Sequence, residues 1–444
     1  MNVLHTKAHE RIRSILDEGS FIEVGAYVCD RNANDGEKQN GDGVVTGYGT
    51  VEGSLVWIYA QNPEYIGGSV GEMHARKICN VYRRAMEMQC PVIGILDSDG
   101  IRLADSNSSM FGFGKLFRMQ AEASGVIPQI AVVAGNCGGA MALAARMSDF
   151  VLMDRENGRL YLNSPDALAG NYREKCDTSS WEYQTASAGN CDISGSMQEI
   201  TEKLKMLIRI LPQNMAEDYS MEQCEDDMNR STAGIDKLES ASDILREISD
   251  NGEMLEIGEG FLKSMRTVFI RLNGRTVGAI ANSTPQLCHR GSAKAARFVR
   301  FCDAFDIPVL TLCNVEKLRA EEEIERYLGG ALSHFVYTFA SATVPKITLV
   351  TKKSFGTAGL AMGSRAVGAD IVLAWDRAVI GAMDPAKLSE LTGNGTKDLT
   401  LDNASKGYID DIISPAETRQ RICAALEMLY SKCVPEVDRK HGAL

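Results

Sequence analysis

The chain has 444 residues, of which 44% are hydrophobic and 24% are charged, a composition typical of a globular protein with two or three domains. Its net charge of −12 at pH 7 argues against a nucleic-acid-binding surface, although it leaves room for a local basic pocket. No apolar run is long enough to span a membrane, so we expect no direct membrane insertion.

The cysteines and histidines suggest a reduced, metal-free protein. The twelve cysteines form no C-x-x-C pair, and several lie inside apolar runs, among them Cys90, Cys137, Cys302 and Cys313. Buried thiols in a cytoplasmic protein are therefore favoured over disulfides. The first residues contain no apolar core of a signal peptide, and no H-E-x-x-H spacing occurs, so we expect no metal in this chain.

The first half of the chain alternates helices and strands. In chain order the pattern predicts a helix over Ala8 to Ile15, a strand over Phe21 to Val24, a β-hairpin over Gly43 to Tyr59 that turns at Glu52-Gly53, a helix over Glu72 to Met88, a strand ending at Leu96 and a helix over Lys115 to Ala123. This order indicates right-handed crossovers and a mostly parallel sheet.

A glycine-rich turn is predicted between a buried strand and a helix in the middle of this half. Ile130 to Ala134 is an apolar, β-branched run, Gly135 to Gly139 is rich in glycine, and Ala140 to Met147 has helix-forming composition. Free N–H groups at a helix start, beside residues without a Cβ, suit an oxyanion that develops on a carbonyl. The alternative is a turn that merely packs a helix against a sheet, and this stretch alone supports both interpretations.

The same arrangement occurs a second time. Thr343 to Val350 repeats the pattern of Gly125 to Val132, and a second glycine turn over Phe355 to Ala358 precedes a helix-like run over Gly359 to Val367. Pro91 and Pro308 are separated by the same offset as Pro128 and Pro345, which predicts duplicated domains. We expect an N-terminal domain over 1–240, with an acidic linker at about 212–240, and a C-terminal domain over 241–444.

The motifs together resemble the carboxyltransferase subunits of biotin-dependent acyl-CoA carboxylases and decarboxylases, from about Arg11 to Lys432. The residues that carry the resemblance are Arg13 to Phe21, Gly67-Gly68-Ser69, Pro91 to Asp97, Ser124 to Ala140, Lys294 to Phe298, Phe301 to Phe305, Gly356 and Met362-Gly363-Ser364. The resemblance implies an α/β fold with two crotonase-like (ClpP/crotonase) domains. It also implies dimeric active sites within a larger ring, a hexamer, with acyl-CoA on the first domain and biotin on the second.

The resemblance also assigns roles to particular residues. Gly138 and Gly139 would hold the acyl thioester oxygen, and Gly356, Thr357 and Ala358 would hold the ureido oxygen of biotin. The residues expected to bind substrate on the acyl-CoA side are Gly67, Gly68, Asp97, Ser98, Gly100 and Arg102. Biotin would arrive on a separate biotin carboxyl carrier protein, and a biotin carboxylase or a membrane decarboxylase subunit would complete the complex. Lys77 is a further possible cation for CoA, whereas His74 is interpreted as an ordinary helix histidine.

Three departures from the family pattern leave other functions open. Thr357 stands where the family usually has a second glycine, Asp99 stands in the usual Ser-Gly-Gly segment, and the loop from Asn314 replaces one that contains proline and glycine. These changes motivate a non-catalytic scaffold paralogue in a mixed ring as the alternative. A crotonase-like hydrolase or isomerase acting without biotin is the third reading, but it would leave the second turn idle.

Overall fold

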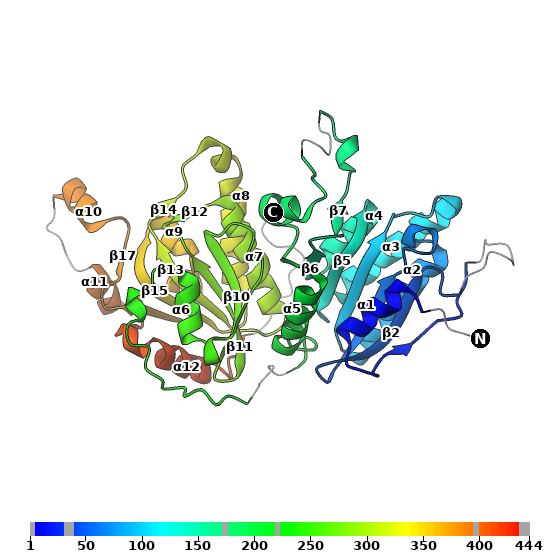
Figure 1. The fold of residues 1–444 in the computed structure, drawn as a ribbon. Helices are drawn as coiled ribbons and strands as arrows, with labels where there is room; N and C mark the ends of the chain where they lie inside the picture. The colour runs from blue at the N-terminus through cyan, green and yellow to red at the C-terminus, as the bar shows by residue number, and fades with distance from the viewer. Residues whose placement is uncertain (1–4, 31–39, 171–175, 218–222, 394–398, 435–444) are drawn as a thin grey trace. The chain divides into compact units, whose positions relative to one another are not determined.

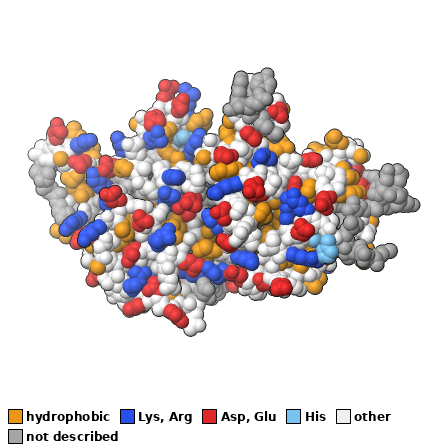
Figure 2. Space-filling view, viewed as in Figure 1, with side chains coloured by type: hydrophobic (Ala, Val, Ile, Leu, Met, Phe, Trp, Pro, Cys, Tyr) orange, Lys and Arg blue, Asp and Glu red, His pale blue; other side chains and the backbone are white. Residues whose placement is uncertain are grey.

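The computed structural model describes residues 5–30, 40–170, 176–217, 223–393 and 399–434. It divides into two compact units, residues 1–217 and 218–444, and each has its own central sheet covered by helices (Figure 1). Every helix of the described residues is too short or too polar to span a bilayer. On the face shown in Figure 2, acidic and basic side chains are intermixed over most of the surface.

The first unit is built on an eight-stranded sheet with the order β1-β2-β3-β4-β5-β6-β8, and β7 pairs with the far end of β5. The antiparallel strands β1, β2 and β3 form one side, and all later pairings are parallel. The strands are β1 (Ile22–Glu23), β2 (Val44–Val51), β3 (Ser54–Gln61), β4 (Val92–Ser98), β5 (Gln129–Gly138), β6 (Phe150–Asp154), β7 (Arg159–Tyr161) and β8 (Ile193–Gly195).

The helices of the first unit bury one apolar face each. They are α1 (Lys7–Ile15), α2 (Glu72–Met88), α3 (Ser106–Ala123), α4 (Ala140–Met147) and α5 (Met197–Ile210). In α2 the buried residues Ile78, Val81 and Ala85 recur at helical spacing and pack in the core with Val92 of β4. The predicted hairpin is confirmed: β2 and β3 pair throughout and turn at Glu52 and Gly53, both of which have positive φ.

The second unit repeats this architecture with the strand order β18-β16-β15-β13-β11-β10-β9, and β17 pairs with the end of β15. The strands are β9 (Met254–Glu256), β10 (Met265–Leu272), β11 (Arg275–Asn282), β12 (Gln286–Leu287), β13 (Val309–Val315), β14 (Lys317–Leu318), β15 (Lys346–Phe355), β16 (Ile371–Trp375), β17 (Val379–Gly381) and β18 (Asp411–Ile413). The helices are α6 (Ala241–Ile248), α7 (His289–Ala304), α8 (Glu322–Ser341), α9 (Gly356–Ala361), α10 (Pro385–Thr392), α11 (Leu399–Ser405) and α12 (Thr418–Met428).

A lysine, buried in the first unit and half-buried in the second, bonds backbone carbonyls at the same place in each unit, where the chain enters its hairpin. Lys77 of α2 donates to the carbonyl of Gly41, 2.9 Å away, and to that of Val44. Lys294 of α7 donates to three carbonyls at 2.8–2.9 Å, those of Gly258, Phe261 and Met265. Because both lysines anchor the segment before a hairpin, the duplication extends to individual side-chain contacts.

Two local expectations differ from the structure. The predicted turn over Gly135 to Gly138 is the last part of β5, which pairs there with β7, so the chain turns only at Gly139. The helix expected over Gly359 to Val367 ends at Ala361, because Gly363 adopts a left-handed φ of 80°.

The segment expected to link the domains, about 212–240, is only partly described. The boundary between the two units falls between Glu217 and Asp218, so most of that segment belongs to the second unit and not to the first. Arg230 bonds Asp226 and the carbonyl of Glu247, and the Thr232 N–H donates to the carbonyl of Ala416. Its polar composition suggested a linker because these long-range contacts leave no local pattern in the sequence.

Candidate functional site

The glycine-rich segments of the first unit meet at the carboxyl ends of β4 and β5. Ser98 pairs with Cys137, and a Cβ built on Gly100 would lie 3.6 Å from the carbonyl oxygen of Gly138. The Asp99 N–H donates to the carbonyl of Gly67 at 2.9 Å. The structure thus brings together Gly67, Gly68, Asp97, Ser98, Gly100, Gly138 and Gly139, all of which the sequence indicated.

Gly139 is the point at which β5 becomes α4. Its φ of 56° and ψ of −125° are accessible to glycine and strained for other residues, and nothing lies within 4 Å of a Cβ built on it. A ligand can therefore approach this backbone closely. A Cβ on Gly138, in contrast, would lie 2.7 Å from the ring of Tyr161, so the reason for glycine at 138 is packing against β7.

The N–H of Gly139 is already used within the fold, because it donates to the carbonyl of Tyr161 at 2.9 Å. The helix continues with Ala142 and Leu143 donating to the carbonyl of Gly139. The N–H groups of Ala140 and Met141 lie in the first helical turn, where α-helical bonding supplies no partner. Sequence reasoning missed these two positions, although the start of the helix-forming run at Ala140 was the available signal.

Asp97 stabilises the backbone around the turn through several hydrogen bonds. Its carboxylate accepts from Arg11 at 2.8 Å and from the N–H of Asn136 at 3.2 Å. Its own N–H donates to the side chain of Gln61 at 3.1 Å, and Arg11 also donates to the carbonyl of Ala134. Asp97 is buried, so its visible role is to fix the ends of β4 and β5 in one arrangement.

Three groups considered as CoA contacts are engaged inside the protein. Arg102 is 3% exposed and donates to Asp30 at 2.9 Å, to Asp42 at 2.6 Å and to the carbonyl of Ser69 at 2.9 Å. These bonds favour a role for the guanidinium in supporting the loop around Ser69 over the direct substrate contact that the sequence suggested. Lys77 is held by carbonyls, and burial lowers its pKa to about 8. Burial also holds the pKa of His74 well below its ordinary value, as expected for a core histidine.

Asp99 places an exposed carboxylate beside this cluster. It accepts a hydrogen bond from the side-chain amide of Asn136 at 3.0 Å, and its Oδ2 lies 2.1 Å from where a Cβ on Gly67 would be. Only glycine at position 67 leaves room for it. The residue that departs from the family pattern is therefore accommodated without disturbing the turn.

The second unit has the equivalent turn at Gly356. Ser354 and Phe355 pair with Ile380 and Gly381 just as Cys137 and Gly138 pair with Leu160 and Tyr161. This register makes Gly356, with a φ of 53°, the counterpart of Gly139. A buried phenylalanine, Phe355, stands at the position of Gly138, so only one glycine of the first turn has a glycine counterpart in the second.

A pocket of about 730 Å³ opens at this second turn. Gly356 and Thr357 line it together with apolar residues such as Leu360 and Ile380, and with Tyr408. Thr357 is exposed, whereas Ala358 is buried, so the threonine is the residue of the predicted group whose side chain meets the pocket. The volume lies in the range of small-molecule sites.

A side-chain amide fixes the equivalent backbone group in both units. The Asn314 N–H donates to the side chain of Asn282 at 2.9 Å, as the Asp97 N–H donates to that of Gln61. Asn282 also donates from its side chain to the carbonyl of Asn314. Asn314 therefore keeps the framework contact of Asp97 without its negative charge.

The candidate metal ligands do not gather in the described residues. All twelve cysteines are free, and no group of three or more His, Cys, Asp or Glu side chains there could hold a metal ion. His5 and His9 stand four residues apart at the start of the chain, but His9 faces Thr6 and Glu23, and His5 faces Arg13.

Two sheets of the same topology, each with a glycine turn at the carboxyl end of a central strand, define a duplicated fold with one such turn in each unit. Residues 5–399 match the carboxyl transferase domain, and the chain belongs to this family. It is 33% identical to the propionyl-CoA carboxylase beta chain of Roseobacter denitrificans, covering 98% of this chain and 92% of that one. It is also 33% identical to the methylmalonyl-CoA decarboxylase subunit alpha of Veillonella parvula, with the same coverage.

The fold agrees with a solved member of the family. The crystal structure of transcarboxylase 12S, described as a hexamer with hydrolysed methylmalonyl-coenzyme A bound, superposes with a TM-score of 0.92 at 32% identity. The match covers 98% of this chain and 92% of the transcarboxylase chain. The expected α/β fold with two crotonase-like domains is thereby confirmed.

Proposed function

We propose that the chain is the carboxyltransferase component of an acyl-CoA carboxylase or decarboxylase. It moves a carboxyl group between biotin, carried by a separate biotin carboxyl carrier protein, and the α-carbon of an acyl-CoA. The observation that carries this proposal is the equivalence of the turns at Gly139 and Gly356, one in each unit, in a chain that belongs to the carboxyl transferase family.

Each turn has a separate electrostatic task. In the first unit, the N–H groups of Ala140 and Met141 stabilise negative charge on the thioester oxygen while the α-carbon loses or gains a carboxyl group. Gly139 leaves the backbone free for this approach, Gly138 makes room for the ring of Tyr161 beside it, and Gly67, Gly68, Ser98 and Gly100 shape the adjoining wall. Asp97 and Arg102 act as positioning residues, because both are already bonded within the protein.

The second turn fits the other oxyanion of this reaction. When bound, biotin supplies the ureido nitrogen that carries the carboxyl group. The N–H groups of Thr357 and Ala358 lie in the first turn of α9 and face charge on the ureido oxygen, and the pocket of about 730 Å³ has apolar walls that suit a fused-ring body. A side-chain nucleophile is not needed for this chemistry.

The assembly follows the relatives. We propose a cytoplasmic dimer-based ring, a hexamer, that works with a biotin carboxylase or with a membrane decarboxylase subunit. The transcarboxylase 12S hexamer, with its bound methylmalonyl-coenzyme A, supports both the assembly and the substrate class.

Carboxyl transfer from labelled methylmalonyl-CoA or malonyl-CoA to free biotin tests the proposal. We expect label to leave the CoA ester only when both the protein and biotin are present. Absence of transfer with every acyl-CoA tried would contradict it. If transfer occurs only in a mixed ring with a second carboxyltransferase that has both glycines, the scaffold function suggested by Thr357 is correct instead.

Thr357 is predicted to weaken the use of biotin. Its exposed β-branched side chain lines the pocket beside Gly356, so Thr357→Gly should enlarge the approach to the first-turn N–H groups. We expect faster turnover with free biotin and an unchanged Kd for CoA, measured by steady-state kinetics and calorimetry. A change in CoA binding without a change in biotin binding would show that the two turns are assigned to the wrong ligands.

A further inference from the structure

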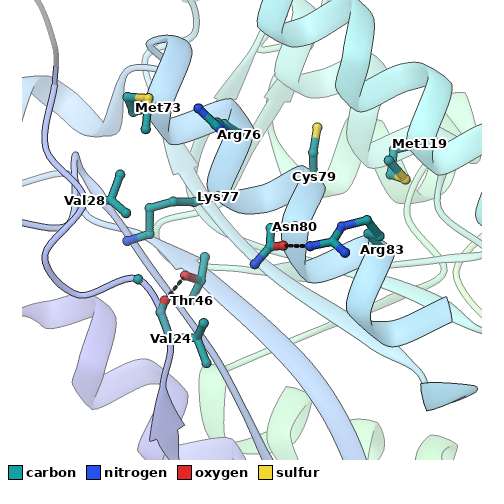
Figure 3. Close-up of a pocket in the computed structure, with 11 residues that line it drawn as sticks. Val24, Val28, Thr46, Met73, Arg76, Lys77, Cys79, Asn80, Arg83 and Met119 are labelled. Atoms are coloured by element: carbon teal, nitrogen blue, oxygen red, sulfur yellow. Dashed lines mark hydrogen bonds between the residues drawn. The ribbon is translucent and has the colours of Figure 1, made fainter. Parts of the chain in front are cut away.

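A basic pocket lies in the first unit. Eleven residues line it, and none of them belongs to the glycine turns. It has a volume of about 550 Å³ and is formed by α2, β2, the segment after β1 and one residue of α3 (Figure 3). The lining residues are Val24, Gly25, Val28, Thr46, Met73, Arg76, Lys77, Cys79, Asn80, Arg83 and Met119. The volume is within the range of small-molecule sites.

The lining is cationic in a protein of net charge −12. Arg76, Lys77 and Arg83 contribute positive charge, and none of the described residues that line the pocket is acidic. Glu87, outside the lining, bonds Arg83 at 3.0 Å, whereas Glu23 bonds His9 and Asp42 bonds Arg102. The pocket therefore favours an anion more than the overall charge would suggest.

The two arginines are arranged for more than one anionic group. Arg76, Asn80 and Arg83 occupy positions i, i+4 and i+7 of α2 and so share one helical face. Seven residues of α-helix rise about 10 Å, so the two guanidinium-bearing positions are about two turns apart. Guanidinium groups bind phosphate with two parallel hydrogen bonds, and their spacing suits two separate phosphate groups.

The remaining walls suit an apolar, flat body. Val24 and Val28 lie on one side of the pocket, and Met119 on the other, in Figure 3. The amide oxygen of Asn80 accepts from Arg83, which turns the amide nitrogen away from that arginine. Hydrogen-bond donors beside apolar and thioether surfaces are suited to a nucleobase.

We propose that this pocket binds a phosphorylated nucleotide. One source is the phosphoadenosine end of the acyl-CoA substrate, an identification that rests on the proposed function, and the other is a free nucleotide acting as an effector. Both have the same chemistry: a base against the valine and methionine walls and phosphates at Arg76 and Arg83. The binding itself needs no carboxyl transfer, so it stands or fails separately from the proposed function.

Two adjacent arginines provide a matched test. The side chains of Arg83 and Arg84 are 50% and 49% exposed, and both bond Glu87, but only Arg83 lines the pocket. With adenosine 3′,5′-bisphosphate as the probe in calorimetry at low salt, Arg83→Glu should weaken binding about tenfold or more, and Arg76→Glu similarly. Arg84→Glu should change the Kd by less than about twofold, because its charge lies outside the pocket.

Each outcome bears on the proposal. Equal weakening by Arg83→Glu and Arg84→Glu would show only a general attraction of anions and would overturn the proposal. Failure of the wild-type protein to bind the probe would also overturn it. Displacement of the probe by propionyl-CoA, but not by propionyl-pantetheine, would support the substrate as its source. Persistence of the probe in the presence of propionyl-CoA would support a separate nucleotide. Thermal melting of each variant checks that the exposed substitutions leave the fold intact.

Discussion

Replacing Gly139 by alanine should lower kcat/KM for carboxyl transfer by roughly 100-fold or more. The backbone at Gly139 has a φ of 56° and a ψ of −125°, and the space around a built Cβ is open. A methyl group there would stand where the thioester must approach. It would also force the backbone to a new conformation and so misdirect the N–H of Ala140. Transfer of label from methylmalonyl-CoA to free biotin measures the loss.

Gly53 offers the matched control for this substitution. It also has a positive φ, 83°, and open space around a built Cβ, but it lies at the hairpin turn between β2 and β3. Gly53→Ala should therefore cost stability through backbone strain, about 1–2 kcal/mol, and leave kcat/KM nearly unchanged. If both variants lost activity alike, strain alone would explain the result and the oxyanion role of this turn would be wrong.

Arg102→Met should lower the free energy of unfolding of the first unit by about 3–5 kcal/mol at neutral pH. The substitution removes a guanidinium that donates to Asp42 at 2.6 Å and to Asp30 at 2.9 Å. Asp42 is fully buried. Its carboxylate would remain in the interior without a positive partner. Urea denaturation of the two proteins, with exposed Arg84→Met as a control near zero, measures the difference.

The loss in Arg102→Met should diminish as the pH falls. Burial already raises the pKa of Asp42 above its ordinary 3.8, and Arg102 opposes this effect. Without Arg102 the folded-state pKa rises further, so the folded protein binds a proton more tightly than the unfolded chain does. The penalty is therefore full above the folded pKa and is relieved towards 3.8. A deficit of equal size at about pH 7 and about pH 5 would contradict this explanation.

The sequence was informative wherever a feature is local or repeated. The hairpin turn at Glu52-Gly53, the position of the helix that starts at Ala140 and the duplicated α/β architecture all follow from short patterns, and the structure confirms them. The gathering of Gly67, Ser98 and Gly138 could be anticipated because carboxyl ends of neighbouring parallel strands lie at one edge of a sheet.

The remaining features depend on contacts between distant residues. Arg11 meets Asp97 across 86 positions, and Arg102 meets Asp42 across 60, so no periodicity reports either pair. Because the sequence does not reveal these partners, Arg102 is interpreted from the sequence as a substrate contact near the predicted acyl-CoA site. The hydrogen bond from the Gly139 N–H to the Tyr161 carbonyl was equally hard to predict from the sequence. It forms only because β5 continues beyond its apolar run and pairs with β7.

The shared amide contacts, Gln61 with Asp97 and Asn282 with Asn314, have an evolutionary consequence. They hold the strand end in each half, while the adjacent turn residues differ between the halves, Gly138 in one and Phe355 in the other. After an ancestral gene doubled, each copy could therefore change its ligand preference by point substitution without risking its architecture. The bonds that hold the strand ends are therefore separate from the residues that line the turns, among them Thr357 and Asp99.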